Sequence, residues 1–152
     1  MTFMVVRVRG SIHARHDVTE TLRYLHLTRA NHATVVPEEP SYRGMLTTVQ
    51  GYVTWGDADS ETVGLLLRQR GEATGGERIT AENAATLLGG KDLAAASRAV
   101  TDAGTVGLHG LKPLFRLRAP KGGWKSTKKP FARGGALGYR GRAVNDLVRR
   151  MV

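Results

Sequence analysis

The positive charge of this chain is concentrated in one stretch near its C-terminus. Beyond Pro120, that stretch has too few regularly spaced apolar residues to build a core of its own. Residues 110–142 contain ten lysines and arginines and no aspartate or glutamate, whereas the rest of the chain carries 13 basic and 13 acidic residues. A segment with charges of one sign repels itself unless a polyanion neutralises it. The net charge of +10 therefore predicts a nucleic-acid partner, with an anionic membrane surface as a distant alternative.

The overall composition limits the fold and the kinds of site that are possible. With 152 residues, 41% of them apolar, the chain can bury one modest core or two small ones. It has no cysteine, so it forms neither a disulfide framework nor a thiolate metal site. The first residues are too soon charged for a signal peptide, and no segment approaches the roughly 20 apolar residues of a membrane span. We expect a soluble, cytoplasmic protein.

Strands and helices are predicted to alternate in the first 56 residues. Apolar and β-branched residues indicate strands at 3–9, 33–36 and 52–55. Apolar residues spaced three to four apart indicate helices at 18–27 and 43–50. The resulting β-α-β-α-β order is typical of a compact α/β unit in which one helical layer covers a small sheet.

The middle segment, residues 57–109, differs in charge and in predicted structure. It holds eight acidic and five basic residues, which argues against a main role in RNA binding. Helices are expected up to residue 70, at 81–88 and at 93–103, packed on the first unit. The expected helix caps in both segments are Asp17, Ser60 and Thr80, and the expected stops are Gly51 and Gly89.

Residues 110–152 are predicted to form a basic, largely irregular tail. Seven glycines and three prolines fall within residues 110–142, interspersed with aromatic residues such as Trp124 and Phe131. Basic side chains neutralise phosphates, glycine lets backbone N–H groups approach phosphate oxygens, and exposed aromatic rings stack on unpaired bases. Within the tail we expect a strand at 115–118 at the sheet edge and a short helix at 143–152.

The tail is predicted to supply most of the RNA contacts. Such segments often become ordered only when RNA provides the opposing surface. The alternative is a solvated, disordered tail with no dedicated partner. The contacts predicted here are Lys112, Arg116, Arg118, Lys121, Gly122, Gly123, Trp124, Lys125, Lys128, Lys129, Arg133, Gly134, Gly135, Arg140 and Arg142.

A second candidate RNA contact lies near the start of the predicted helix at 43–50. Tyr42 and Arg43 are suited to gripping a phosphate there, and Gly44 permits close approach. A plain junction between a turn and a helix explains the same residues equally well.

Two further candidates contain histidine. His13, Arg15 and His16 follow the first predicted strand, and we interpret them as a phosphate contact. The His-x-x-His spacing also occurs in metal sites, but no nearby cysteine or paired carboxylate completes a zinc site, so no metal is expected. Asn31 and His32 are either another RNA contact or a simple helix stop.

Catalytic motifs are absent from the sequence. The Gly89-Gly90-Lys91 sequence lacks the upstream glycine and the following serine or threonine of a phosphate-binding loop. There is no Gly-x-Ser-x-Gly motif and no cysteine nucleophile. An acyl phosphate hydrolase using Arg15 and Asn31 is an alternative that nothing else in the sequence supports. We therefore expect no enzyme activity, no cofactor and no small-molecule substrate.

Several segments together resemble one protein family. Residues 41–56, Ser-Tyr-Arg-Gly-Met-Leu-Thr-Thr-Val-Gln-Gly-Tyr-Val-Thr-Trp-Gly, resemble the core of the L-thirty family of large-subunit ribosomal proteins, called L-seven in eukaryotes. Residues 22–37 suit the first helix and second strand of that family. Residues 117–123 and 134–138, with the ending Asp-Leu-Val-Arg-Arg-Met, look like the long form found in archaea and eukaryotes. Because a long basic N-terminal extension is missing, the resemblance favours the archaeal type.

The resemblance implies an α+β fold with three parts. These are a ferredoxin-like β-α-β-α-β core at 1–56, a helical extension at 57–109, and a basic tail at 110–152 inserted among ribosomal RNA. It also implies a structural constituent of the large ribosomal subunit. The implied partners are large-subunit ribosomal RNA near 5S RNA and neighbouring ribosomal proteins, with no membrane. The alternative is a non-ribosomal RNA-binding module, such as a chaperone or a processing accessory protein.

Overall fold

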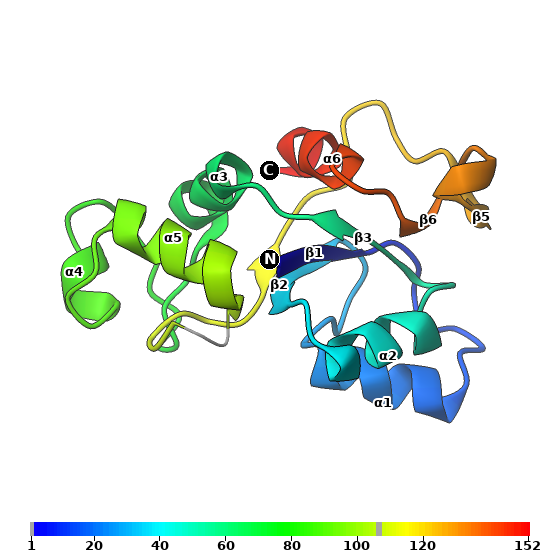
Figure 1. Ribbon diagram of the computed structural model, residues 1–152, viewed down its shortest axis with the longest axis horizontal. Helices are drawn as coiled ribbons and strands as arrows, with labels where there is room; N and C mark the ends of the chain where they lie inside the picture. The colour runs from blue at the N-terminus through cyan, green and yellow to red at the C-terminus, as the bar shows by residue number, and fades with distance from the viewer. Residues whose placement is uncertain (1, 106–107) are drawn as a thin grey trace.

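A six-stranded sheet lies between two layers of helices (Figure 1) in this computed structural model, which describes residues 2–105 and 108–152. The strand order is β4-β2-β1-β3-β6-β5. The strands are β1 (Thr2–Arg7), β2 (His32–Pro37), β3 (Val53–Asp57), β4 (Phe115–Arg116), β5 (Ser126–Pro130) and β6 (Gly135–Tyr139). The helices are α1 (His16–Tyr24), α2 (Pro40–Thr48), α3 (Ser60–Arg70), α4 (Ala84–Leu87), α5 (Leu93–Ala103), α6 (Ala143–Met151) and the short 3-10 helix η2 (Phe131–Arg133).

The predicted β-α-β-α-β core is confirmed, with β1 at its centre. β1 pairs antiparallel with both β2 and β3, so that Met4 lies opposite Val35 on one side and Gly56 on the other. Successive side chains of a strand point to opposite faces. Phe3 therefore packs in the cluster under α1 and α2, whereas Met4 belongs to the cluster under α3, α5 and α6. Helices cover both faces, and every residue of β1 is buried.

The first helical layer, α1 and α2, forms from the apolar spacing that the sequence shows. Val18, Leu22 and Leu25 are buried against the sheet, as the periodicity predicts. Asp17, however, is not the N-cap of α1. Arg15 occupies that position in an extended conformation, and Asp17 lies in the first helical turn, where its negative charge favours the helix N-terminus.

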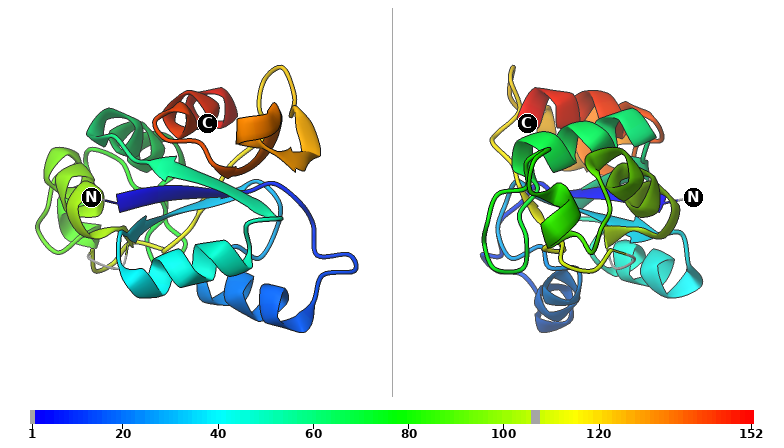
Figure 2. Two further views of the ribbon diagram at one scale, coloured as in Figure 1. Left: turned by 45° about the vertical axis from the view of Figure 1, so that its right-hand side comes forward. Right: turned by 90° about the vertical axis from the view of Figure 1, so that its left-hand side faces the viewer.

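The second layer, α3, α5 and α6, covers the opposite face of the sheet (Figure 2). Asp59, rather than Ser60, caps α3, because its carboxylate accepts a hydrogen bond from the backbone N–H of Thr62 at 2.6 Å. α6 is strongly amphipathic and buries one side completely. The buried apolar residues of α6 are Val144, Leu147, Val148 and Met151.

The middle helix is shorter than the sequence predicts. Helix is expected at 81–88, but α4 includes only Ala84–Leu87. Thr80 and Asn83 exchange side-chain hydrogen bonds with each other's backbone N–H, at 2.7 Å and 3.4 Å. Because these local bonds stabilise a turn, the helix begins only after Asn83.

The tail contains more regular structure than the sequence predicts, because β5 and β6 were not expected. β4 extends the sheet beside β2, β6 pairs in parallel with β3, and β5 pairs with β6. Phe115 is fully buried, and Ala136 and Leu137 also lie in the interior. β4 and β6 depend on strands made by distant residues, and β5 in turn depends on β6, so their own sequence shows little periodicity. The expected strand at 115–118 and the final helix are confirmed, the strand in a shorter form.

None of the described helices is long and apolar enough to cross a membrane.

Candidate nucleic-acid interface

The β5–β6 module, residues 125–139, carries the densest unpaired positive charge in the tail. Lys125, Lys128, Lys129 and Arg133 are all exposed on it. No ion pair within residues 2–105 and 108–152 includes any of the four. Figure 1 shows the module projecting beside α6 at one end of the sheet. Its cations are therefore available to an external polyanion.

Glycines shape the turn of this module. Gly134 adopts a left-handed conformation with φ of 80° and is exposed at the end of η2. Gly135 is buried at the start of β6, directly against the backbone of Lys129. This close approach holds β5 and its lysines against β6. Gly122 and Gly123 form an exposed turn after Pro120 and line a pocket together with Lys125 and Phe131 of the module.

Replacing Gly135 with alanine is expected to lower the free energy of unfolding by about 2 kcal/mol. A Cβ at this position would overlap the backbone carbonyl of Lys129, so β5 would have to move. Urea denaturation followed by circular dichroism measures the loss. Gly10→Ala is the matched control, since no atom lies within 4 Å of the added methyl group. Equal stability of the two variants would contradict tight packing of β5 on β6.

Two residues of the tail that were predicted to contact RNA instead pack against or hydrogen-bond to the rest of the protein. Trp124 is half-buried against the cluster of Val8, Ala136 and Leu137. Arg140 donates from Nε to the Thr54 hydroxyl at 2.7 Å and from Nη2 to the Ala136 carbonyl at 2.7 Å. Burial lowers the pKa of Arg140 to about 10, which leaves it charged at neutral pH.

A second basic surface, which we call the arginine groove, is formed by three separate segments. Arg70 comes from the end of α3, Arg78 from the loop that follows it, and Arg116 and Arg118 from the tail. Together they line a groove of about 360 Å³. Sequence reasoning missed Arg70 and Arg78, because they lie in the mildly acidic middle segment and only the tertiary fold brings them to Arg116.

Two side chains that line the arginine groove also make contacts within the protein. Arg78 donates to the carbonyl of Gln69 at 2.9 Å, at the end of α3. Glu72 lines the groove and forms an ion pair with Lys112 at 3.4 Å. Lys112 is thus already neutralised within the protein, whereas Arg70, Arg116 and Arg118 have no ion-pair partner among the described residues.

The remaining tail candidates lie beside α6. Lys121 is exposed, and its carbonyl accepts a hydrogen bond from Nη1 of Arg150 at 3.3 Å. Arg142 is exposed at the N-cap position of α6, where its carbonyl accepts from Nδ2 of Asn145 at 3.0 Å. Both side chains remain open to solvent.

Tyr42, Arg43 and Gly44 lie inside α2, which begins earlier than predicted, at Pro40. Tyr42 is half-buried against the core, and Gly44 is exposed. The guanidinium of Arg43 forms an ion pair with Glu38 and lies 5.7 Å from the centre of the Phe3 ring. These contacts give the arginine a local partner in the protein.

The His13–His16 loop is exposed at the same end of the sheet as the β5–β6 module (Figures 1 and 2). Arg15 pairs with Asp17 at 3.2 Å, and His13 and His16 are both exposed. Within the described residues, no group of three or more histidine, cysteine or acidic side chains is placed to hold a metal ion.

Asn31 and His32 lie where the loop after α1 leads into β2, and both are at least partly buried. The backbone N–H of Asn31 donates to the Arg7 carbonyl at 2.8 Å, with φ of 68°. His32 is 9% exposed. Burial, and to a lesser degree the neighbouring Arg116, lower its pKa below the ordinary value. His32 therefore does not present a charged ring to solvent in this structure.

Comparison with known proteins identifies the family. Residues 3–53, which run from β1 to the start of β3, match the family described as Ribosomal protein L30p/L7e. A "Large ribosomal subunit protein uL30" from Methanosphaera stadtmanae is 39% identical over 151 residues, covering 99% of both chains. The chain belongs to the ribosomal protein L30p/L7e family. The suggested resemblance is thereby confirmed.

Other uL30 relatives show the same full-length similarity to this L30p/L7e protein. The protein from Methanopyrus kandleri is 41% identical over 149 residues, covering 95% of this chain and 100% of the relative. That from Archaeoglobus fulgidus is 40% identical over 151 residues, covering 98% and 99%. The β5–β6 module and the arginine groove thus lie beyond the 3–53 match but within the full-length similarity. Membership of a ribosomal protein family also confirms the expectation of a non-enzymatic protein.

Proposed function

We propose that this chain is a structural constituent of the large ribosomal subunit that binds and positions ribosomal RNA. The observation that carries the proposal is the similarity, over nearly the whole chain, to proteins named as large-subunit components. The unpaired cations of the β5–β6 module support the RNA-binding part of it. The corresponding place of action is the ribosome in the cytoplasm.

In the proposed mechanism, two basic surfaces attached to one sheet position two segments of ribosomal RNA. β6 holds the β5–β6 module beside β3, while β4 holds Arg116 at the opposite edge beside β2. Each surface binds phosphates of a different RNA segment, so the sheet fixes the distance between the segments. Most contacts go to the RNA backbone and its shape rather than to base edges. We also propose a position near 5S RNA and contacts with neighbouring ribosomal proteins. Residues 1–56, 57–109 and 110–152 are proposed to act as core, helical extension and basic RNA-binding tail.

Sedimentation of a cell lysate through a sucrose gradient tests the proposal. The protein is expected to migrate with the large subunit, both before and after a high-salt wash, because many phosphate contacts and burial among RNA helices retain it. Immunodetection across the fractions measures this. Migration at the top of the gradient, or release by mild salt, would contradict a structural role and favour a free RNA-binding module.

A further inference from the structure

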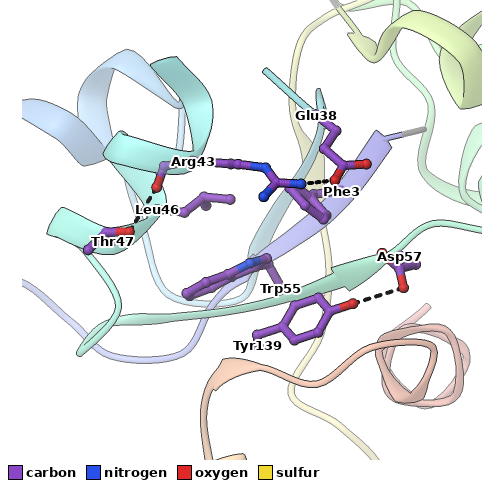
Figure 3. A pocket seen from close by; sticks show the side chains of 8 residues that line it. All are labelled: Phe3, Glu38, Arg43, Leu46, Thr47, Trp55, Asp57 and Tyr139. Carbon is purple, nitrogen blue, oxygen red and sulfur yellow. Dashed lines mark hydrogen bonds and ion pairs between the residues drawn. The ribbon is translucent and has the colours of Figure 1, made fainter. Parts of the chain in front are cut away.

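An open groove between α2 and β6 lies on the sheet face that α1 and α2 cover only in part. Its volume is about 570 Å³. We call it the aromatic groove, and Figure 3 shows its side chains. They are Phe3, Glu38, Arg43, Leu46, Thr47, Trp55, Asp57 and Tyr139. Neither the charge pattern nor the helical periodicity of the sequence indicates that these residues meet.

Two aromatic rings stand side by side in this groove because of the sheet register. Trp55 of β3 is the parallel partner of Tyr139 of β6, so their side chains share one face. Their ring centroids are 6.4 Å apart, and the planes are tilted by 51°. Tyr139 is 50% exposed, whereas Phe3 is buried beneath it, edge-on at 6.3 Å. The half-exposed ring of Tyr139 offers a face on which a flat, unsaturated ligand can stack.

Two carboxylates in the groove determine which polar groups of a ligand it can bind. Asp57 accepts a hydrogen bond from the Tyr139 hydroxyl at 2.9 Å, and Glu38 is paired with Arg43 (Figure 3). An ionised carboxylate has about four acceptor sites on its two oxygens, so both groups retain free acceptor capacity. Because Arg43 neutralises Glu38, the charge of Asp57 leaves the groove net negative, which disfavours phosphate, and the carboxylates can accept hydrogen bonds from amino groups on base edges. The groove is thus unsuited to the RNA backbone and suited to a base.

The groove adjoins the β5–β6 module, because Tyr139 belongs to both. Tyr139 ends β6, and β5, with Lys128 and Lys129, pairs with that same strand. A single-stranded segment whose phosphates contact the module therefore needs only a short path to bring a base to Tyr139. The neighbouring positive charge favours RNA over a cationic peptide, which the lysines of the module would repel.

We propose that the aromatic groove binds one unpaired nucleobase that carries an exocyclic amino group. The base stacks on the exposed ring of Tyr139 with Trp55 at its side, its amino edge faces Asp57, and its flanking phosphates lie along the β5–β6 module. The inference rests on the proposed RNA-binding function and adds a base-specific contact to a protein whose other surfaces bind the backbone.

Binding of short RNA to the full-length chain tests this. The probes are a labelled hexaadenylate and a hexamer of purine riboside, which lacks only the amino group, measured by fluorescence anisotropy at low salt. The wild-type protein is expected to bind hexaadenylate several-fold more tightly than the purine riboside hexamer. Tyr139→Leu is expected to lose about fivefold or more in affinity for hexaadenylate and to bind the two hexamers equally.

Two further variants separate stacking from other effects. Tyr139→Phe retains the ring and is expected to keep most of the affinity. Tyr24→Leu is the matched control, because Tyr24 is 75% exposed on α1, away from the groove, and its loss is expected to leave binding unchanged. Thermal unfolding of each variant verifies that the fold is intact.

The possible outcomes distinguish this inference from the proposed function. If Tyr139→Leu binds hexaadenylate as the wild type does while the wild type sediments with the large subunit, the inference is wrong and the proposed function stands. If the variant instead loses only its affinity for an arginine-glycine repeat peptide, the groove is a protein site, which also overturns the inference. A wild-type chain that binds neither hexamer nor large-subunit ribosomal RNA would contradict the proposed function itself.

Discussion

Replacing Lys125, Lys128 and Lys129 together with glutamine is expected to lower the affinity for large-subunit ribosomal RNA on the order of 10²-fold at moderate salt. These exposed side chains lack ion-pair partners in the described part of the chain, so each is free to displace a counterion from a phosphate. The slope of log affinity against log salt concentration is expected to fall by about 3. Filter binding of protein-free ribosomal RNA over a salt series measures both quantities.

The control for this variant removes the same charge elsewhere. Arg68, Lys91 and Arg98 are also exposed, but they lie in the middle segment, outside the β5–β6 module. Their replacement with glutamine is expected to change the affinity only slightly. If the two triple variants lost affinity equally, net charge alone would account for binding, and the module would have no special role.

Replacing Phe115 with alanine is expected to lower the free energy of unfolding by about 3–5 kcal/mol. Phe115 is fully buried in the main core cluster although it belongs to the tail, because β4 pairs with β2 and carries its ring inward. The alanine variant leaves a cavity that the surrounding side chains fill only in part. Equilibrium urea denaturation of the RNA-free protein measures the loss.

Ile12→Ala is the corresponding control, since Ile12 is 84% exposed. Its effect on the free energy of unfolding is expected to stay within about 0.5 kcal/mol. If Phe115→Ala changed the free energy of unfolding as little, the start of the tail would be only loosely attached to the sheet in the absence of RNA. That result would agree with the prediction of a tail that becomes ordered only on RNA.

The elements that sequence reasoning located well depend on local patterns. Val18 and Leu22 mark the buried side of α1 by their spacing alone, and α5 has the predicted bounds because Asp92 caps it. β6 was missed because its residues Gly138 and Tyr139 pair with β3, which is more than 80 residues earlier in the chain. Non-local pairing of this kind leaves little trace in a short, glycine-rich sequence.

The residues of the candidate site also differ in whether the sequence alone could identify them. The lysines of the β5–β6 module could be identified from the sequence, because residues 110–142 contain no acidic residue. Arg70 and Arg78 become candidates only when the fold brings them to Arg116. Trp55 and Tyr139 are likewise unremarkable as single aromatic residues, and only the parallel register makes them neighbours.

The sheet order also determines when the protein can complete its fold during synthesis. β1, β2 and β3 can pair as soon as the first 57 residues are made, with α1 and α2 on one face. The other face, with Met4 and Val35, stays uncovered until α3 and α5 have been synthesised, and β3 acquires its second neighbour only with β6. α6, the last helix, then covers the remaining apolar surface. Between residue 57 and the end of α5 at residue 103, the growing chain therefore exposes one face of its sheet, which is the state in which a chaperone at the tunnel exit would protect it from aggregation.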